Sequence, residues 1–531
     1  MGIPSYFSQI IRAYPNILLR YADIINRRIC FSRLYIDSNS ILYDCYHKLP
    51  KNISEKELIN TLIKNTIEKI EMYIDQIKPS KYAFIAFDGV APLAKMEQQR
   101  TRRYKSWFET TVMNKISETD PGFTTSMFTP GTNFMNQLDK ALCSHFYENS
   151  RVIIEGSTTY GEGEHKLYNH LRENPCNENE HIAIYGLDAD LLMLSLVNLK
   201  NCNNMYVYRE APAFISVLVS TDANNKYDED EPFFVDIEHL SRSIINEMAC
   251  SDSSMGRIYD YVFLCFMLGN DFLPHFPSLN IRTRGIDILL STYRTVLGKK
   301  KQKFLITEDN KIKWNHFSML LDHLSRHEYE YVCQESVHRQ KWNRKQPDIQ
   351  PTKTISEKET YFLNVPVMFR KEEKYISPKD TIGWESRYYS VLFNENINKN
   401  NICQNYLEGI EWVTQYYLDG NVQWKWKYNY HYPPLLKDLY SYFPNYSGLS
   451  NCNSRPVSSM IQLAYVLPPV YHNLLPNKIR NKLKKDYSHL YVNEIENMTF
   501  LWAYCRYFWE SHVILPHICE DTIRKWEKMF L

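Results

Sequence analysis

The 531-residue sequence lacks several features that would assign it to a specialised class of protein. It has no apolar run of the ~20 residues that a membrane-spanning helix needs. Its 12 cysteines form no Cys-x-x-Cys motif or zinc-type cluster, and no signal peptide is visible, so we expect reduced thiols in an intracellular protein. The formal net charge is only +1, so any nucleic-acid site must be a local basic patch.

Short apolar segments alternate with helix-like segments in the first part of the chain. Residues 34–36, 83–87 and 181–185 are apolar or β-prone and are predicted to be strands. Residues 55–76 carry apolar side chains at helical spacing, and residues 191–196 are also predicted to be helical. This alternation predicts an α/β fold with a parallel sheet.

Each predicted strand is followed closely by an aspartate, at Asp37, Asp88 and Asp188. Because ligands bind at the carboxyl ends of strands in open α/β sheets, we expect these side chains to converge in space. The apolar run from residue 261 to 268 fits either a strand or a buried helix, since periodicity alone does not decide. It ends in Gly-Asn-Asp, which places another acid, Asp271, behind a glycine.

Two pairs of carboxylates have a single residue between their members: Glu162 and Glu164, and Asp188 and Asp190. Two bare carboxylates about 4 Å apart repel by roughly 4 kcal/mol at an effective dielectric near 20. A cation between them relieves this repulsion, and oxygen-only ligands select a hard ion such as Mg²⁺ or Mn²⁺. The pattern therefore predicts a two-metal site for phosphodiester hydrolysis. The predicted catalytic and metal-binding residues are Asp37, Asp88, Glu162, Glu164, Asp188, Asp190 and Asp271.

Each of these acids also has a simpler structural explanation. An aspartate after a strand can bond to nearby backbone, Asp188 could cap the next helix, and Asp190 could complement its dipole. Glu162 and Glu164 could be exposed on a glycine-rich loop. These explanations do not account for acids at several strand ends together with two glycine-flanked pairs, which favours the metal site.

A basic segment follows Asp88 directly and can be helical from residue 94 onward. Four of its side chains then fall on one face: Lys95, Gln99, Arg102 and Arg103. Arginine makes bidentate contacts and glutamine adds a neutral donor, so such a face beside an acidic metal site suits a terminal phosphate. The alternative is that this charged helix face is simply exposed to solvent, as most such faces are. Its position directly after Asp88 favours phosphate binding instead.

The sequence divides into three parts. Residues 1–336 hold the acids and the basic segment and are predicted to be a nuclease domain. Residues 337–372 are polar and rich in Lys, Arg, Gln and Thr, which predicts a linker. Residues 373–531 are dense in Tyr and Trp. Most of these aromatic residues are expected in the core or at an interface, and one or two as platforms for unpaired bases.

With these motifs the chain resembles the Xrn-type 5′→3′ exoribonuclease family over nearly its whole length. The matching segments begin with Met-Gly-Ile-Pro-Ser-Tyr-Phe and Leu-Tyr-Ile-Asp-Ser-Asn-Ser-Ile-Leu. They continue with Phe-Asp-Gly-Val-Ala-Pro-Leu-Ala-Lys-Met-Glu-Gln-Gln-Arg, Gly-Glu-Gly-Glu-His-Lys, Tyr-Gly-Leu-Asp-Ala-Asp-Leu and Leu-Gly-Asn-Asp-Phe-Leu-Pro-His. Residues 409–412 with 416–417, residues 431–435 and residues 467–469 resemble the family's second conserved region. The chain looks like a minimal nuclease core, similar to the N-terminal half of the large cytoplasmic members.

The resemblance implies a PIN/FLAP-like α/β fold followed by a helical, aromatic-rich region. It implies a processive enzyme of RNA decay that releases mononucleotides from single-stranded RNA bearing a 5′-monophosphate, with two Mg²⁺ ions or Mn²⁺ as the alternative. The acids above match the family's metal ligands, and the basic face matches its phosphate pocket. Tyr43, where the family usually has His, and Trp509 would stack on the leading bases. We further expect a monomer in the cytoplasm, with a nuclear location left open.

Two other functions remain open on the sequence. A flap-type, structure-specific DNA endonuclease shares a related acidic α/β core, but its helix-hairpin-helix clamp is not evident after Asp271. An inactive RNA-binding scaffold would have no reason to keep the uncompensated negative charge of the acidic set.

Overall fold

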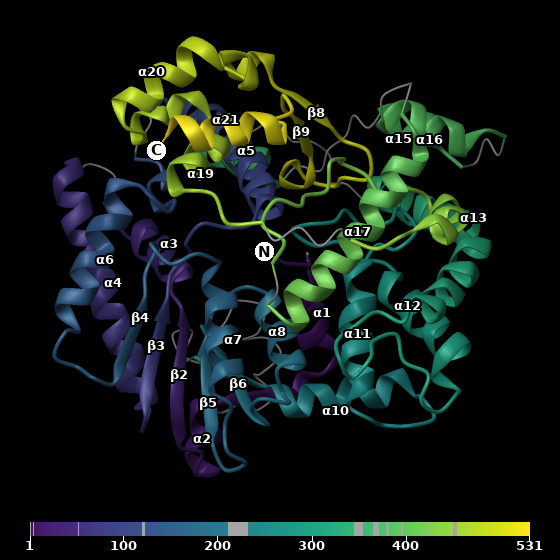
Figure 1. Ribbon diagram of the computed structural model, residues 1–531, viewed down its shortest axis with the longest axis horizontal. Coiled ribbons are helices and arrows are strands. Elements are labelled where there is room, and N and C mark those ends of the chain that lie inside the picture. The colour runs from purple at the N-terminus through teal and green to yellow at the C-terminus, as the bar shows by residue number, and fades with distance from the viewer. Residues whose placement is uncertain are drawn as a thin grey trace.

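The structure is a computed structural model (Figure 1). It describes residues 2–3, 5–50, 53–118, 123–210, 232–344, 354–364, 371–378, 382–393, 397–420, 422–449 and 454–530. The helices of the first part are α1 (Tyr6–Ala13), α2 (Tyr21–Asn26), α3 (Asn39–His47), α4 (Glu55–Ile77), α5 (Leu93–Ser117), α6 (Asn133–His145), α7 (Gly163–Glu173), α8 (Asp190–Val197), α10 (Ile237–Met248), α11 (Gly256–Phe266) and α12 (Gly285–Tyr293). They are followed by α13 (Trp314–Arg344), α14 (Ile355–Asn364), α15 (Lys371–Ile376), α16 (Trp384–Leu392), α17 (Lys399–Leu418), α18 (Leu436–Tyr442), α19 (Ser459–Val466), α20 (Asn477–Asp486) and α21 (Glu520–Met529).

A seven-stranded sheet forms the centre of the first part, in the order β1-β7-β6-β5-β2-β3-β4. Its strands are β1 (Leu18–Arg20), β2 (Phe31–Asp37), β3 (Tyr82–Ala86), β4 (Val152–Glu155), β5 (His181–Tyr185), β6 (Asn204–Arg209) and β7 (Phe233–Asp236). Strands β4, β3, β2, β5 and β6 run parallel, which confirms the predicted α/β class and the predicted strands. At one edge β7 and β1 are paired antiparallel, and no sequence pattern predicted them.

The strand order places a crevice where the predicted acids lie. From β2 the chain moves to β3 and β4 on one side, and then returns to β5 and β6 on the other side of β2. The connections after β2 and β5 therefore lead away in opposite directions. Such a switch point opens a crevice at the carboxyl ends of the two strands, where open α/β sheets bind their ligands.

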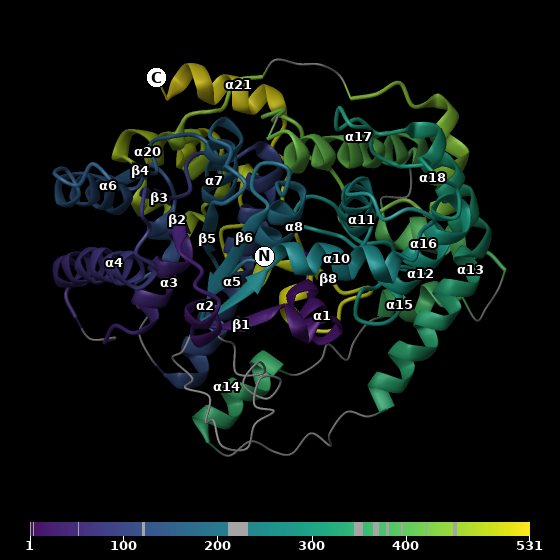
Figure 2. The same ribbon diagram turned by 90° about the horizontal axis from the view of Figure 1, so that it is seen from below.

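Helices cover both faces of the sheet, so its central strands are buried on both sides. Along β2, Leu34 and Ile36 pack with α4 and α6, whereas Tyr35 points to the opposite face and packs with α7 and α8. Helix α4 confirms the helix predicted over residues 55–76; Ser54 caps it by accepting a hydrogen bond from the backbone of Glu57. Figure 2 shows α4 and α6 at one side of the molecule and α10 to α13 at the other.

The ambiguous apolar run before Asp271 is helical and forms most of α11. Within the range predicted as a linker, residues 337–344 continue α13, and α14 and the start of α15 follow. Helix α13 extends this far because Arg339 is buried and donates to Glu373 and to the carbonyl of Cys505. Residues 345–353 and 365–370 of that range lie outside the described residues. No helix in the described part of the chain is long and apolar enough to cross a bilayer.

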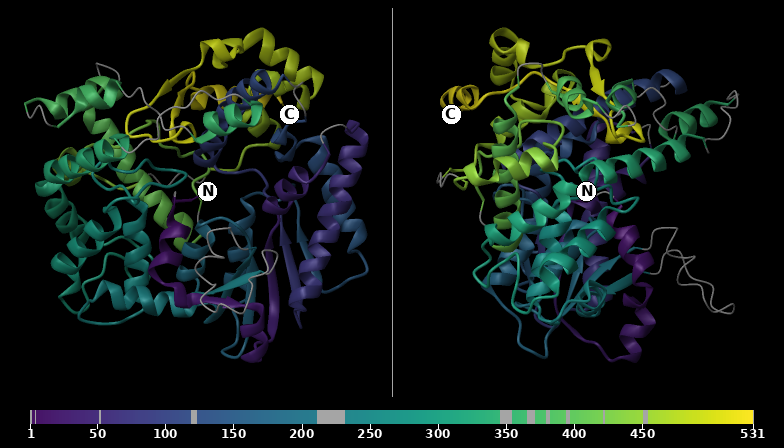
Figure 3. Two further views of the ribbon diagram at one scale, coloured as in Figure 1. Left: turned by 180° about the vertical axis from the view of Figure 1, so that it is seen from behind. Right: turned by 90° about the vertical axis from the view of Figure 1, so that its right-hand side faces the viewer.

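The aromatic-rich C-terminal part is mainly helical, as predicted, and adds a two-stranded antiparallel sheet of β8 (Thr499–Leu501) and β9 (His512–Ile514). Its last elements lie with α5 above the sheet, both in Figure 1 and from behind in Figure 3. The buried guanidinium of Arg100 on α5 donates to the carbonyls of Leu490 and Pro516, at 2.9 Å each. Helix α5 is thus tied directly to the C-terminal part.

We predict that Arg100→Gln lowers the thermal unfolding midpoint, because it leaves two buried carbonyls without their donor at a cost of about 2–4 kcal/mol. The matched control is Arg242→Gln, whose side chain is 70% exposed; it should change stability by no more than about 0.5 kcal/mol. Calorimetry or circular dichroism would measure both midpoints. Equal midpoints for the two variants would contradict the proposed tie between α5 and the C-terminal part.

Candidate active site

Four of the predicted acids lie where the sheet and its helices meet. Asp37 is the last residue of β2, Asp88 follows β3, Asp188 lies in the loop after β5, and Asp190 is the first residue of α8. Each is therefore positioned by a strand or helix end rather than by a long loop. This is the convergence that the strand-end pattern predicted.

Glu162 and Glu164 flank the first residue of α7, and this residue has to be glycine. The amide of Gly163 donates to Asp88 Oδ1 at 2.7 Å. A Cβ atom on Gly163 would lie 2.7 Å from Asp37 Oδ1, closer than real side chains approach. Glycine thus lets the start of α7 come between the two strand-end aspartates, and it brings both glutamates to them.

Burial and mutual repulsion raise the pKa values of several of these carboxyl groups. The pKa of Asp37 lies well above its usual range because the group is buried and faces Asp88 and Asp188. Burial and the nearby Asp190 likewise raise the pKa of Glu164. Burial and the charge of Asp271 raise the pKa of Asp190 to about 7. For each of these three groups a neighbouring carboxylate adds to the rise, so extra positive charge favours keeping all of them ionised.

Lys95 supplies one positive charge at the edge of the cluster. Its ammonium lies 2.5 Å from Glu162 Oε2 and 2.8 Å from Asp271 Oδ2. Burial raises the pKa of Asp271, but the charge and hydrogen bond of Lys95, together with other nearby cations that include Arg102, outweigh this effect and hold that pKa below its usual range. Lys95 was predicted to face a terminal phosphate; it lies at the junction of the acids and the basic face of α5.

The remaining oxygen atoms fit a hard divalent cation. Among the described residues, no hydrogen-bond donor reaches the buried atoms Asp37 Oδ1, Glu164 Oε2 or Asp190 Oδ1. An unpartnered buried carboxylate oxygen is costly, and a metal ion would satisfy it. Since the donors are carboxylate oxygens, the cluster suits Mg²⁺ or Mn²⁺ better than a thiophilic metal.

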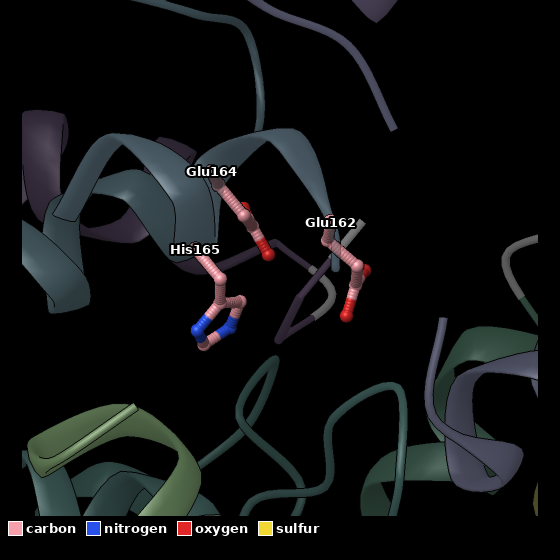
Figure 4. Close-up of side chains that lie close together, drawn as sticks. All are labelled: Glu162, Glu164 and His165. Carbon is pink, nitrogen blue, oxygen red and sulfur yellow. The ribbon is translucent and has the colours of Figure 1, made fainter. Parts of the chain in front are cut away.

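Tyr416 of α17 completes the site; it lies in a segment that resembles the family's second conserved region, but no local sequence pattern gave it a role in the site. Figure 4 shows Glu162, Glu164 and His165 close together at the start of α7, and one ligand atom from each lies within 4.8 Å of the others. The His165 ring stacks on Tyr416, with centroids 3.6 Å apart. The hydroxyl of Tyr416 donates to Glu162 Oε1 at 2.6 Å, across 254 residues of sequence. The second conserved region therefore helps to orient an acid of the first part.

A cavity of about 1660 Å³ lies beside the acids and collects most of the predicted site residues. Those on its wall are Asp37, Asp88, Glu162, Glu164, Asp188, Asp271, Tyr43, Lys95, Gln99, Arg102, Arg103 and Trp509. Asp190 is not on the wall, but its charge acts on Glu164 in the cluster. The acidic cluster and the basic face of α5 thus share one space.

Helix α5 presents two different faces, of which the helical spacing predicted only the amide and cationic one. Buried side chains, among them Met96 and Tyr104, pack against the C-terminal part. On the cavity side, Arg102 lies 3.4 Å from the hydroxyl of Tyr43, and Gln99 accepts from Gln462. Burial lowers the pKa of Arg103 to about 10, and its Nε has no acceptor among the described residues. A buried cation with a free donor favours an anionic ligand.

The two predicted base platforms come from different parts of the chain. Tyr43 on α3 makes an edge-on contact with Phe128, at 5.2 Å between centroids. Trp509 precedes β9 and is 45% exposed. Lys105, one turn after Arg102 on α5, donates to the backbone carbonyl of Trp509 at 2.7 Å. Helix α5 therefore runs between the elements that carry the two rings.

Two family models together match most of the chain. One, described as the XRN 5′-3′ exonuclease N-terminus, matches residues 1–211. The other, described as the Xrn1 helical domain, matches residues 255–380 and 370–529. These matches include the motifs on which the resemblance was based.

Curated relatives align with nearly the full chain. The 5′-3′ exoribonuclease 2 of Gallus gallus is 25% identical, over 99% of this chain and 69% of the relative. The 5′-3′ exoribonuclease 1 of Homo sapiens is 26% identical, over 98% of this chain but 34% of the relative. Among solved structures, the catalytic core of Rad2 in complex with DNA substrate aligns at 12% identity and a TM-score of 0.35, over 84% of this chain and 95% of that one. This last likeness is too distant to support an argument.

We predict that Tyr416→Phe weakens metal binding about tenfold, because it removes the hydrogen bond that orients Glu162 but keeps the ring on His165. The Mn²⁺ dissociation constant, measured by electron paramagnetic resonance of the free ion, should rise. Tyr388→Phe is the control, since that buried hydroxyl donates to the carbonyl of Pro433 away from the acids. An unchanged Mn²⁺ affinity in Tyr416→Phe would show that the contact does not orient a metal ligand.

Proposed function

The chain belongs to the XRN 5′-3′ exonuclease family, as its motifs predicted, and on this basis we propose that it is a processive 5′→3′ exoribonuclease of RNA decay. Its substrate is single-stranded RNA with a 5′-monophosphate, and its products are mononucleotides. The observation that supports this most is that the acidic cluster and the cationic face of α5 line the same cavity. A terminal phosphate held on α5 would place the first phosphodiester near the acids, which gives the reaction its direction.

We assign two Mg²⁺ ions, with Mn²⁺ as the alternative, to the acidic cluster. The residues that would hold them are Asp37, Asp88, Glu162, Glu164, Asp188, Asp190 and Asp271. Two ions bound there would align the attacking water with the leaving oxygen and stabilise the charge that develops on both. Lys95 and Tyr416 each hold one oxygen of Glu162 and so fix its orientation. Gly163 holds Asp88 through its backbone amide.

The 5′ end is bound by residues of α5 and by two aromatic rings. Gln99, Arg102 and Arg103 face the cavity and together offer donors of the kind that hold one phosphate group. A pocket that accommodates a single phosphate group would exclude a triphosphate or a cap by steric hindrance. Tyr43 and Trp509 would stack on the leading bases, which contributes about 1–3 kcal/mol per base without sequence preference. We further propose a cytoplasmic monomer.

The two alternatives are less favoured. The family matches cover the C-terminal part as well as the acidic part, whereas a flap-type DNA endonuclease shares only a related acidic core. A scaffold without catalysis would gain nothing from burying repelling acids such as Asp37 and Glu164.

We predict that Asp188→Ala abolishes hydrolysis but retains RNA binding, because it removes a metal ligand and leaves α5 and the aromatic rings unchanged. End-labelled RNA would report cleavage, and fluorescence anisotropy would report binding. Asp521→Asn, whose side chain is 78% exposed, should behave as wild type. Normal turnover of Asp188→Ala would rule against the acidic cluster as the catalytic centre.

Arg103→Gln should raise KM for 5′-monophosphorylated RNA about tenfold or more, because a buried charge-assisted contact of about 1.5–3 kcal/mol is lost. The KM for RNA with a 5′-hydroxyl should rise much less. The preference of the enzyme for a 5′-monophosphate over a 5′-hydroxyl should therefore become smaller. The assay compares 5′-monophosphate, 5′-hydroxyl, triphosphate and capped RNA, with and without EDTA. Equal degradation of all ends by the wild-type protein would refute the phosphate pocket.

A further inference from the structure

A row of aromatic rings and guanidinium groups leads away from the wall of the cavity at Trp509. The Trp509 and Tyr507 rings are nearly parallel, with centroids 6.2 Å apart and an angle of 15°. The guanidinium of Arg506 lies 5.3 Å from the centroid of Tyr507 and 4.8 Å from that of Trp342. The row therefore consists of two rings, a cation and a third ring, and it runs from Trp509 to the last turn of α13.

The inner end of the row is continuous with the candidate active site. The guanidinium of Arg282 lies 5.2 Å from the centroid of Trp509, and both residues line the cavity. Arg282 is neutralised by Glu510. The outer members Arg506, Tyr507 and Trp342 are not among the residues of the cavity wall. The row thus starts at the cavity and extends beyond it.

Two properties distinguish this row from a packed core. Its members are partly or largely accessible; Trp509 is 45% exposed, and the others are half-buried. In the part of the chain that the structure describes, no carboxylate pairs with the guanidinium of Arg506, unlike Arg282. The Arg506 guanidinium is therefore held between two rings with its hydrogen-bond donors still available.

We propose that Trp342, Arg506 and Tyr507 form a second binding site for single-stranded RNA, which holds nucleotides on the 3′ side of those in the cavity. The inference rests on the proposed function, since the RNA is the substrate. Aromatic ring faces stack with unpaired bases of any sequence. A guanidinium group held over a ring can still donate hydrogen bonds to the oxygens of a phosphate. RNA is favoured over a peptide because the row continues from the cavity that would hold the 5′ end.

The site would serve processivity. Each cleavage releases the nucleotide whose phosphate and base were bound in the cavity, so the strand loses its 5′ contacts once per cycle. Binding of the downstream nucleotides keeps the strand from dissociating while the next 5′ end enters the cavity. Because stacking does not depend on sequence, the strand can move along the row one nucleotide at a time.

The test compares the RNA affinity of Trp342→Ala and Arg506→Gln with that of the wild-type protein. Two 5′-monophosphorylated oligouridylates are used, a long one and one of only three nucleotides. Binding is measured in EDTA, which prevents hydrolysis. Loss of one ring should weaken binding of the long RNA roughly 5- to 100-fold. The effect on the trinucleotide should be several-fold smaller. Arg506→Gln should reduce the slope of log affinity against log salt by about 0.7, as expected for one lost phosphate contact.

Processivity is measured by adding excess unlabelled RNA after the first cut, and both variants should release partly digested strands sooner. Tyr147→Ala removes an 86% exposed ring elsewhere and is the matched control. Arg506→Gln is the second variant because the Arg506 side chain forms no ion pair among the described residues, so the test does not depend on whether Trp342→Ala folds. Wild-type affinity for long RNA in Arg506→Gln would overturn the inference. If instead wild-type protein binds long RNA through this row but hydrolyses none, the proposed function fails and the second site stands.

Discussion

Repulsion among buried carboxylates is the constraint on which the rest of the structure depends. Asp37 and Glu164 are pushed toward their neutral forms by burial and by neighbouring acids, so the cluster opposes folding unless cations bind. The fold holds the acids in place regardless. The strand order brings the ends of β2 and β5 together, and Gly163 lets α7 approach both Asp37 and Asp88. A rigid sheet edge is thus required to keep these negatively charged groups close together, because a flexible loop would let the carboxylates move apart.

The C-terminal part completes the site and does not simply cover it. Tyr416 of α17 holds one oxygen of Glu162, while Lys95 of α5 holds the other. Helix α5 is itself fixed by Arg100, which reaches two carbonyls of the C-terminal part. The orientation of one metal-binding candidate therefore depends on both parts of the chain. This explains why the aromatic-rich part packs so closely on α5, and many of its rings are buried.

The sequence was sufficient for features that depend on local pattern. Alternating apolar segments predicted the central strands, glycine-flanked acids predicted the cluster, and helical spacing predicted the cavity face of α5. Features that depend on distant contacts were not predictable. Strands β1 and β7 are three and four residues long and are defined only by their pairing. Tyr416 lies 254 residues from Glu162 in the sequence. The extension of α13 depends on the contact of Arg339 with the carbonyl of Cys505, which forms only in the folded chain.

The near-zero net charge limits how this protein can hold RNA. With a formal charge of +1, no overall field attracts a polyanion, so affinity has to come from the few cations and rings that line the strand's path. Phosphate contacts weaken steeply with salt, whereas stacking on aromatic rings does not require net charge. A chain of this composition gains most by combining one strong 5′-phosphate contact with several stacking contacts. On the proposed function, the high tyrosine and tryptophan content of the C-terminal part would serve base stacking where rings reach the surface, as at Trp509, in addition to its structural role in the core.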